Sequence, residues 1–260
     1  MTLNPSLWNK PGAYDYFDEL ALDGLAWECL RRNAEYQRDY AAIAGNTPAD
    51  TIAQHWGLRV LLNPETTARD NSVFWTPPLT SADILLSSVT VPANSPPLSI
   101  PVLPSGSDAT GQFASVGSGP SELHLSFLDA PRPDAALCIV IPLDADMPDR
   151  IEAVRRLWQL MNSGAAPDQR LTRERRLRLR AMLRACDGRA SGATVREIAQ
   201  DLFGGDRIAD ELWSSSPLRY ATLRLIRDGQ HMIHGGYRDL LRGATAEKRR
   251  RSRGLPGVRT

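Results

Sequence analysis

Apolar side chains recur at helical spacing through the C-terminal half of the chain. Between Val195 and Phe203 they stand at positions i, i+3, i+4, i+7 and i+8, which places them along one face of a helix. Similar patterns, with Ser, Pro or Gly at their ends, predict helices at 148–163, 171–186, 194–203 and 217–234. In the first of these helices, one face carries Ile151, Val154, Trp158 and Met161.

Shorter apolar runs predict β-strands ahead of these helices. Leu123, Leu125 and Phe127 alternate with polar residues, as expected for a strand with one buried face. Such alternation, and runs rich in β-branched residues, predict strands at 56–62, 71–79, 84–91, 123–127 and 136–143. The short, proline-containing connection between the last two favours a hairpin or a pair of neighbouring strands.

The N-terminal region is expected to be helical. Residues 14–45 predict one long helix, in which Gly24 weakens the middle and Gly45, followed by Asn46, provides the end. Residues 77–120 are rich in Pro, Ser and Gly and predict a linker that contains a strand. These patterns together predict an α+β fold that is mainly α.

The same patterns divide the chain into four parts. We expect an acidic, helical N-terminal domain with short strands, a linker, a helical C-terminal domain preceded by the β-hairpin, and a basic tail. Their predicted bounds are 1–76, 77–120, 121–243 and 244–260.

Charge is distributed unevenly between the two halves of the chain. Residues 1–150 hold 8 basic and 18 acidic side chains, a net charge of −10, whereas residues 151–260 hold 23 basic and 12 acidic side chains, a net charge of +11. Such asymmetry favours an acidic partner for the basic half, and duplex DNA is the commonest one. Two solvated surfaces without a partner are the alternative.

The segment 194–234 has the features of a helix-turn-helix. Thr194 and Glu197 have the spacing of a capping box, and Ser216 and Pro217 favour the start of the second helix. In this motif the second helix lies in the major groove. The connection at 204–215 is longer than a standard turn, so the motif would be a divergent one.

The second helix of this unit has an apolar face and an opposite basic face. Arg, Tyr and Gln side chains can contact phosphates and base edges in the major groove. The residues expected to contact DNA here are Arg219, Tyr220, Arg224, Arg227 and Gln230. A solvated helix face is the alternative.

The helix predicted at 171–186 carries a second basic stripe. Its members are Arg173, Arg176, Arg180 and Arg184, spaced by three, four and four residues. Because neighbouring arginines repel one another, they require a polyanion or an acidic surface. We expect them to contact the DNA backbone, and an ion-paired interface with the acidic N-terminal half is the alternative.

Motifs for other classes of protein are absent from the sequence. There is no phosphate-binding G-x-x-x-x-G-K-[ST], no G-x-G-x-x-G, no H-E-x-x-H and no G-x-S-x-G. His231 and His234 lack a third ligand nearby, so we expect no metal site, no cofactor and no enzymatic activity. Cys138 is expected to be a buried thiol within a strand.

The sequence also indicates the cellular compartment of the protein. No run approaches the roughly 20 apolar residues of a membrane helix, and the N-terminus lacks the pattern of a secretory signal. The three cysteines are far apart and odd in number, which disfavours a disulfide framework. We therefore expect a cytoplasmic protein with no membrane partner.

These motifs carry a family resemblance. The pattern T-V-R-E-I-A-x-x-L-F-G at 194–204, with Trp213 and G-Y-R-D-L-L at 236–241, resembles the C-terminal domain of regulators from proteobacterial integrative and conjugative elements. A regulator-like domain often precedes it in these proteins. The residues similar to that domain are Trp8, 14–17, 26–36, 56–58 and 74–75.

The resemblance implies a two-domain transcriptional activator of excision or conjugative-transfer genes, of the rhizobial type. It also implies a variant helix-turn-helix at the C-terminus and an N-terminal domain that contacts an antiactivator or RNA polymerase. A homo-oligomer is compatible with this family. The alternative is an antiactivator-like module that binds proteins and not DNA.

Overall fold

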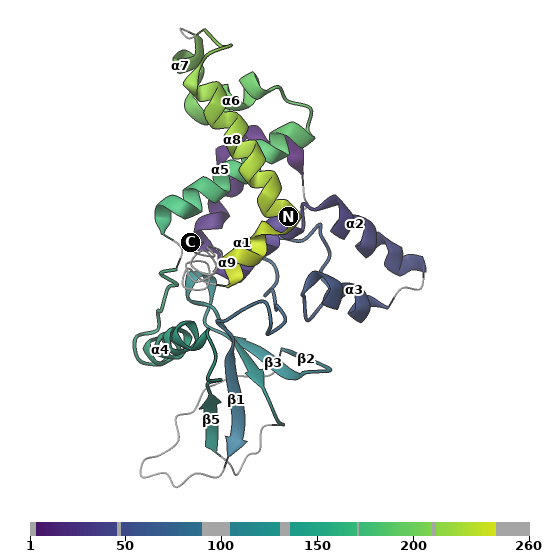
Figure 1. Cartoon of the computed structure of the whole chain (residues 1–260), viewed down its shortest axis with the longest axis vertical. Helices are drawn as coiled ribbons and strands as arrows, with labels where there is room; N and C mark the ends of the chain where they lie inside the picture. The colour runs from purple at the N-terminus through teal and green to yellow at the C-terminus, as the bar shows by residue number, and fades with distance from the viewer. Residues whose placement is uncertain are drawn as a thin grey trace, which may run out of the picture.

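The computed structural model describes residues 4–45, 48–89, 105–130, 136–170, 172–209 and 212–242. The molecule is elongated, with a group of helices at one end and a β-sheet at the other (Figure 1). The helices of the C-terminal half are α4 (Met147–Ser163), α5 (Arg173–Ala190), α6 (Val195–Phe203), α7 (Gly205–Ala209), α8 (Pro217–His231) and α9 (Tyr237–Leu241).

Helices α4, α5, α6 and α8 confirm the four helices predicted from the apolar spacing of the C-terminal half. The capping box forms: the side chain of Thr194 accepts a hydrogen bond from the Glu197 amide, and the Glu197 carboxylate accepts one from the Thr194 amide. The predicted helix 217–234 ends earlier, because His234 and Gly235 leave the helical conformation and Gly235 has a φ of +124°. Gly235 thereby separates α8 from α9.

The long N-terminal helix predicted at 14–45 is wrong. The structure has instead the short elements η1 (Pro5–Asn9), η2 (Pro11–Glu19), α1 (Leu22–Leu30), α2 (Ala34–Ala41), η3 (Ala42–Gly45) and α3 (Ala49–Trp56). The chain is extended at Leu20 and Ala21. Asn33 is extended as well, and its side chain caps α2 by accepting from the Glu35 amide. The extended residues and the Asn33 cap divide this region into short helices, although its apolar spacing fits one long helix.

A five-stranded sheet forms the other end of the molecule. Its strands are β1 (Ile84–Val89), β2 (Gly106–Asp108), β3 (Gly111–Val116), β4 (Leu123–Phe127) and β5 (Ala136–Val140), in the spatial order β2-β3-β4-β1-β5. β1 is parallel to β4 and antiparallel to β5. The predicted hairpin of β4 and β5 is therefore wrong, because β1 lies between them. Part of the predicted linker, moreover, folds into the sheet. Cys138 of β5 is only partly buried, contrary to the sequence expectation.

The predicted strand at 56–62 does not form either. Helix α3 continues to Trp56 and is capped by Gly57, which has a φ of +80°. Beyond it, Leu58 makes only an isolated antiparallel bridge with Trp75.

Among the described residues, three hydrophobic clusters hold the elements together. The largest joins residues 14–75 of the N-terminal region to residues of α5, the turn after α8, and α9. A second lies between the sheet and α4, and a third between α5, α6 and α8. The first cluster means that the two halves of the chain share a core. The bounds proposed for the four parts stay a prediction.

Candidate nucleic-acid interface

Helix α8 is fixed at one end of the molecule by its buried face. Ser216 caps it by accepting from the Leu218 amide, and Leu225 and Ile226 pack with Ala185 of α5 and Ile198 of α6. At Gly229 a Cβ atom would lie 2.6 Å from the Cys186 sulfur. This close approach locks α8 against α5.

The opposite face of α8 is open to solvent. Tyr220 is 56% exposed, and Arg224, Arg227 and Gln230 are exposed along the same side. Arg219 is half-buried, with its guanidinium 5.7 Å from the centre of the Tyr220 ring. The structure thus brings all the predicted α8 residues to one surface of one helix.

One acidic residue interrupts this basic surface. Asp228 accepts hydrogen bonds from Arg227 at 2.9 Å and from Arg178 of α5 at 2.7 Å. Desolvation opposes ionisation of Asp228, but the bonds from Arg227 and Arg178 prevail and lower its pKa. Arg178 was missed in the sequence, because only tertiary packing decides which side of α5 lies beside α8.

The arginine stripe of α5 is used differently from expectation. Arg176 donates to the carbonyl oxygens of Phe17 and Leu20, at 2.6 Å and 2.8 Å. Arg180 lies 2.9 Å from Asp15 and 3.7 Å from Asp18. These partners belong to the acidic N-terminal half, as the alternative interpretation of the stripe holds.

Arg184 is the most buried member of the stripe. It is only 8% exposed, it pairs with Asp201 of α6, and it donates to the Trp8 carbonyl at 3.2 Å. Arg176, Arg180 and Arg184 therefore already have partners within the chain, and their contact with DNA stays a prediction. Their side of α5 faces η1, η2 and α6 rather than solvent. Arg173, at the start of α5, is exposed and stays a predicted DNA contact.

A buried ionic network fastens α5 to the N-terminal region. Arg32 donates to Asp187 of α5 at 3.0 Å and to Glu28 at 2.9 Å, and Tyr14 donates to Asp187 at 2.6 Å. Burial disfavours the charge on Arg32, but Asp187 and Glu28 outweigh it and raise the pKa of Arg32. The helices under α8 are thus anchored to the N-terminal half by paired charges.

Two family models match this chain. Residues 140–242 match the T6SS transcription factor DNA-binding domain of the RovC type. Residues 7–60 match the proteobacterial transcriptional regulator-like domain. The comparison with curated proteins gave no match.

The chain is therefore similar to transcriptional regulators in two separate segments, of which the C-terminal one matches a DNA-binding domain. The DNA-binding match covers α4 to α9 and includes the exposed face of α8. The regulator-like match covers η1 to α3, the part that pairs with the arginine stripe. Both models describe transcriptional regulators rather than enzymes. The expected link to integrative and conjugative elements is not part of either description.

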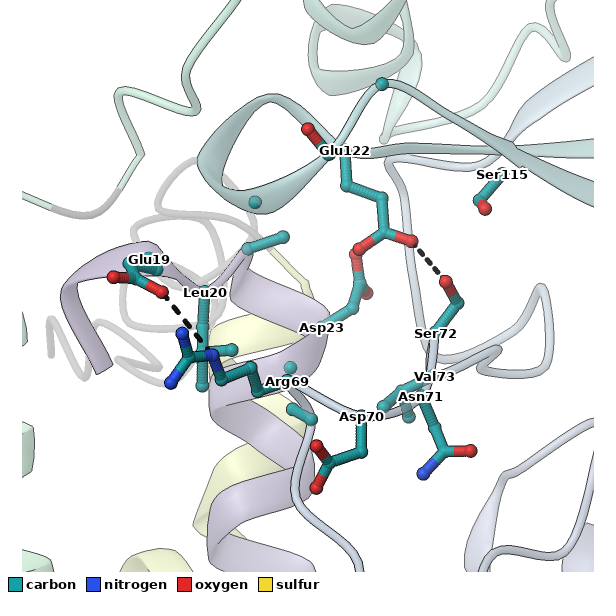
Figure 2. Close-up of a pocket in the computed structure, with 16 residues that line it drawn as sticks. Glu19, Leu20, Asp23, Arg69, Asp70, Asn71, Ser72, Val73, Ser115 and Glu122 are labelled. Carbon is teal, nitrogen blue, oxygen red and sulfur yellow. Dashed lines mark hydrogen bonds and ion pairs between the residues drawn. The ribbon is translucent and has the colours of Figure 1, made fainter. Parts of the chain in front are cut away.

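A pocket of about 360 Å³ lies between the start of α1, the loop 68–73 and the sheet. Figure 2 shows Asp23 and Glu122 pointing toward each other inside it, and Glu122 accepts from Ser72 at 2.7 Å. Glu19 at its rim is 3.8 Å from Arg69. Since carboxylates dominate this pocket, it would repel a phosphate backbone, and the α8 face remains the candidate DNA surface.

Two further features are absent from the described ranges. No group of three or more His, Cys, Asp or Glu side chains could hold a metal ion there. Nor does any described helix combine the length and apolar character needed to span a membrane.

Proposed function

We propose that this chain is a transcriptional regulator that recognises double-stranded DNA with the exposed face of α8. The observation that carries the proposal is the position of Tyr220, Arg224, Arg227 and Gln230 on one solvent-facing side of a helix, inside the segment that matches a DNA-binding domain. A helix presented in this way fits the width of the major groove.

The side chains divide by the contacts that their chemistry allows. Arg224 and Arg227 can bind guanine edges or phosphates, and Gln230 can bind an adenine edge. Arg219 and Tyr220 lie at the start of α8, where a recognition helix can contact base edges or the adjacent phosphates. Arg173 and Arg178 of α5 would extend the basic surface along the phosphates.

The regulated genes form the finer part of the proposal. The resemblance to regulators of mobile elements supports activation of excision or conjugative-transfer genes. In this proposal the exposed surfaces of η1 to α3 are where RNA polymerase or an antiactivator binds.

Capture of genomic DNA tests the proposal. Purified protein is mixed with fragmented genomic DNA of its host, and the recovered fragments are sequenced. The test variant is Arg224→Ala with Arg227→Ala. The control is Arg38→Ala with Arg69→Ala, which removes the same charge from side chains 75% and 66% exposed and outside α8.

We expect a few sharp peaks with the unmodified chain and the control, and their loss with the α8 variant. The genes beside the peaks then test the finer proposal. Even binding across the genome that the α8 variant retains would contradict sequence recognition by α8. Recovery of no DNA would favour the antiactivator-like alternative.

A further inference from the structure

A carboxylate lies among the arginines where α5 and α8 pack together (Figure 1). Both oxygen atoms of Asp228 accept hydrogen bonds. Oδ1 accepts from Nε of Arg227 at 3.1 Å and from its Nη2 at 2.9 Å, and Oδ2 accepts from Arg178 of α5 at 2.7 Å. The Asp228 side chain is 27% exposed, whereas that of Arg227 is 76% exposed. Asp228 is therefore fixed between two helices, and it holds an arginine that reaches into solvent.

The bonds to Asp228 use one edge of the Arg227 guanidinium. This group carries five N–H donors in a planar fork. Because Nε and Nη2 face Asp228, the edge formed by Nη1 and Nη2 remains for another acceptor. Two donors along that edge match the O6 and N7 acceptors of guanine in the major groove. A guanidinium that is already held in one plane also loses less conformational entropy when it binds a base edge.

Arg224 on the same helix is in a different situation. It is exposed and lies one turn before Asp228, and no carboxylate of the described residues pairs with it. Asp228 itself repels phosphates, so it weakens binding to DNA that offers only a phosphate backbone. The two arginines therefore suit different contacts, although their spacing on α8 is that of a single stripe.

We propose that Asp228 determines the specificity of the α8 surface by holding Arg227 for a guanine in the major groove. The inference rests on the proposed function and names a base that this surface reads. Arg178 is a positioning residue, because it fixes the second oxygen atom of Asp228 from α5. The preferred DNA site should then contain a guanine whose contribution depends on Arg227 and not on Arg224.

Selection of binding sites from a library of random duplexes, with the purified full chain, gives the preferred sequence. Each guanine in it is then replaced in turn by adenine, and fluorescence anisotropy measures the affinity. One replacement should weaken binding of the unmodified chain by about 5- to 150-fold, the range of a bidentate base contact. The same replacement should have no effect on Arg227→Ala. Arg224→Ala, which removes the same charge from the same helix, should keep the preference for that guanine.

Asp228→Asn keeps the size of the side chain and removes its charge. We expect this variant to lose most of the preference for that guanine and to bind random duplexes more tightly. Its salt dependence should be steeper by about one unit, since an arginine becomes available to a phosphate. The control Glu65→Gln removes a like charge from an exposed residue of the N-terminal region and should change none of these quantities.

The possible results separate this inference from the proposed function. If every replacement affects Arg227→Ala as it affects the unmodified chain, Arg227 reads no guanine and the inference is overturned, while specific binding by α8 stands. An Asp228→Asn variant that keeps the full guanine preference would overturn it as well, even with a shifted midpoint of urea unfolding. A chain that selects no sequence would overturn the proposed function and this inference together.

Discussion

Helices α5 and α8 both carry arginines at helical spacing, yet the structure places them in opposite environments. On α5, Arg176 and Arg180 meet carbonyls and carboxylates of the N-terminal half. On α8, Arg224 is exposed and has no ion-pair partner among the described residues. Arginine suits both roles, because its planar guanidinium binds carboxylate, carbonyl and phosphate oxygens alike.

The difference shows that a row of arginines along a helix does not by itself indicate which groups those arginines bind. Helix α5 lies between the N-terminal elements and α8, so its arginines find oxygen atoms within the molecule. Helix α8 lies on the outside of the molecule, and only one of its faces is buried. Substitutions on the side of α5 that faces the N-terminal half should therefore affect mainly stability, and substitutions on the exposed face of α8 should affect mainly DNA affinity.

The largest effect is expected at the buried network of α5. Asp187→Ala leaves Arg32 buried beside Glu28 alone, with both Arg32 and Asp187 side chains only 6% exposed. Removal of one partner of a buried pair costs about 3–5 kcal/mol. Urea unfolding should show this loss in the free energy of unfolding.

The matched control is Asp228→Ala on α8, where Arg178 and Arg227 are 47% and 76% exposed. An exposed pair contributes about 0–1 kcal/mol, so this variant should unfold nearly as the unmodified chain does. Equal losses for the two variants would contradict the division into inward and outward charges.

The next effect is expected in DNA affinity. Arg224→Ala with Arg227→Ala should weaken specific binding by about 2–5 kcal/mol, from about 1–3 kcal/mol for each base contact. Fluorescence anisotropy on a captured fragment would measure it, and the midpoint of urea unfolding should not move. A large loss of stability with unchanged affinity would reverse the roles assigned to α5 and α8.

The sequence was sufficient where local signals agree with tertiary structure. The helices α4, α6 and α8 follow from capping residues and apolar spacing, and the exposed face of α8 follows from the same spacing. The sequence could not show which apolar face of α4 is buried and which is exposed. The exposed residues Ile151 and Trp158 are as apolar as Leu157 and Leu160, which are buried against the sheet. Only the position of the sheet decides between them.

Long-range pairing was beyond the sequence for the same reason. The pairing of β1 with both β4 and β5 is set by contacts across many residues, whereas proximity in sequence favoured a hairpin. Along the chain, Arg180 is at least 162 residues from its partners Asp15 and Asp18. Arg184 is 17 residues from its partner Asp201. Spacing along α5 shows that these charges share a stripe but not which oxygen atoms they meet.

Ionisable side chains that point into the molecule should also differ from exposed ones in how they make stability depend on pH. Burial alone would lower the pKa of His124, but Asp23, Glu122 and Asp83 raise it to about 9. Because the folded pKa exceeds the ordinary 6.5, the stabilisation is complete below that value and is lost as pH rises through about 9. We expect a loss of roughly 3 kcal/mol over this range.

Urea unfolding at a series of pH values measures this loss, and His124→Gln should flatten the curve. An identical pH profile for His124→Gln would show that His124 is not the group responsible.

The smallest effect is expected at Arg180, and it is the most direct test of the comparison. Its partners Asp15 and Asp18 are 66% and 53% exposed, so Arg180→Ala should cost less than about 1 kcal/mol in stability. If α5 contacted the DNA backbone, this substitution would weaken binding to all DNA and reduce the salt dependence by about one unit. Because Arg180 is already paired within the chain, we expect the anisotropy titration and its salt slope to match those of the unmodified chain. A uniform loss of affinity would instead mean that phosphates displace Asp15 and Asp18, and that the α5 stripe serves both the fold and the DNA.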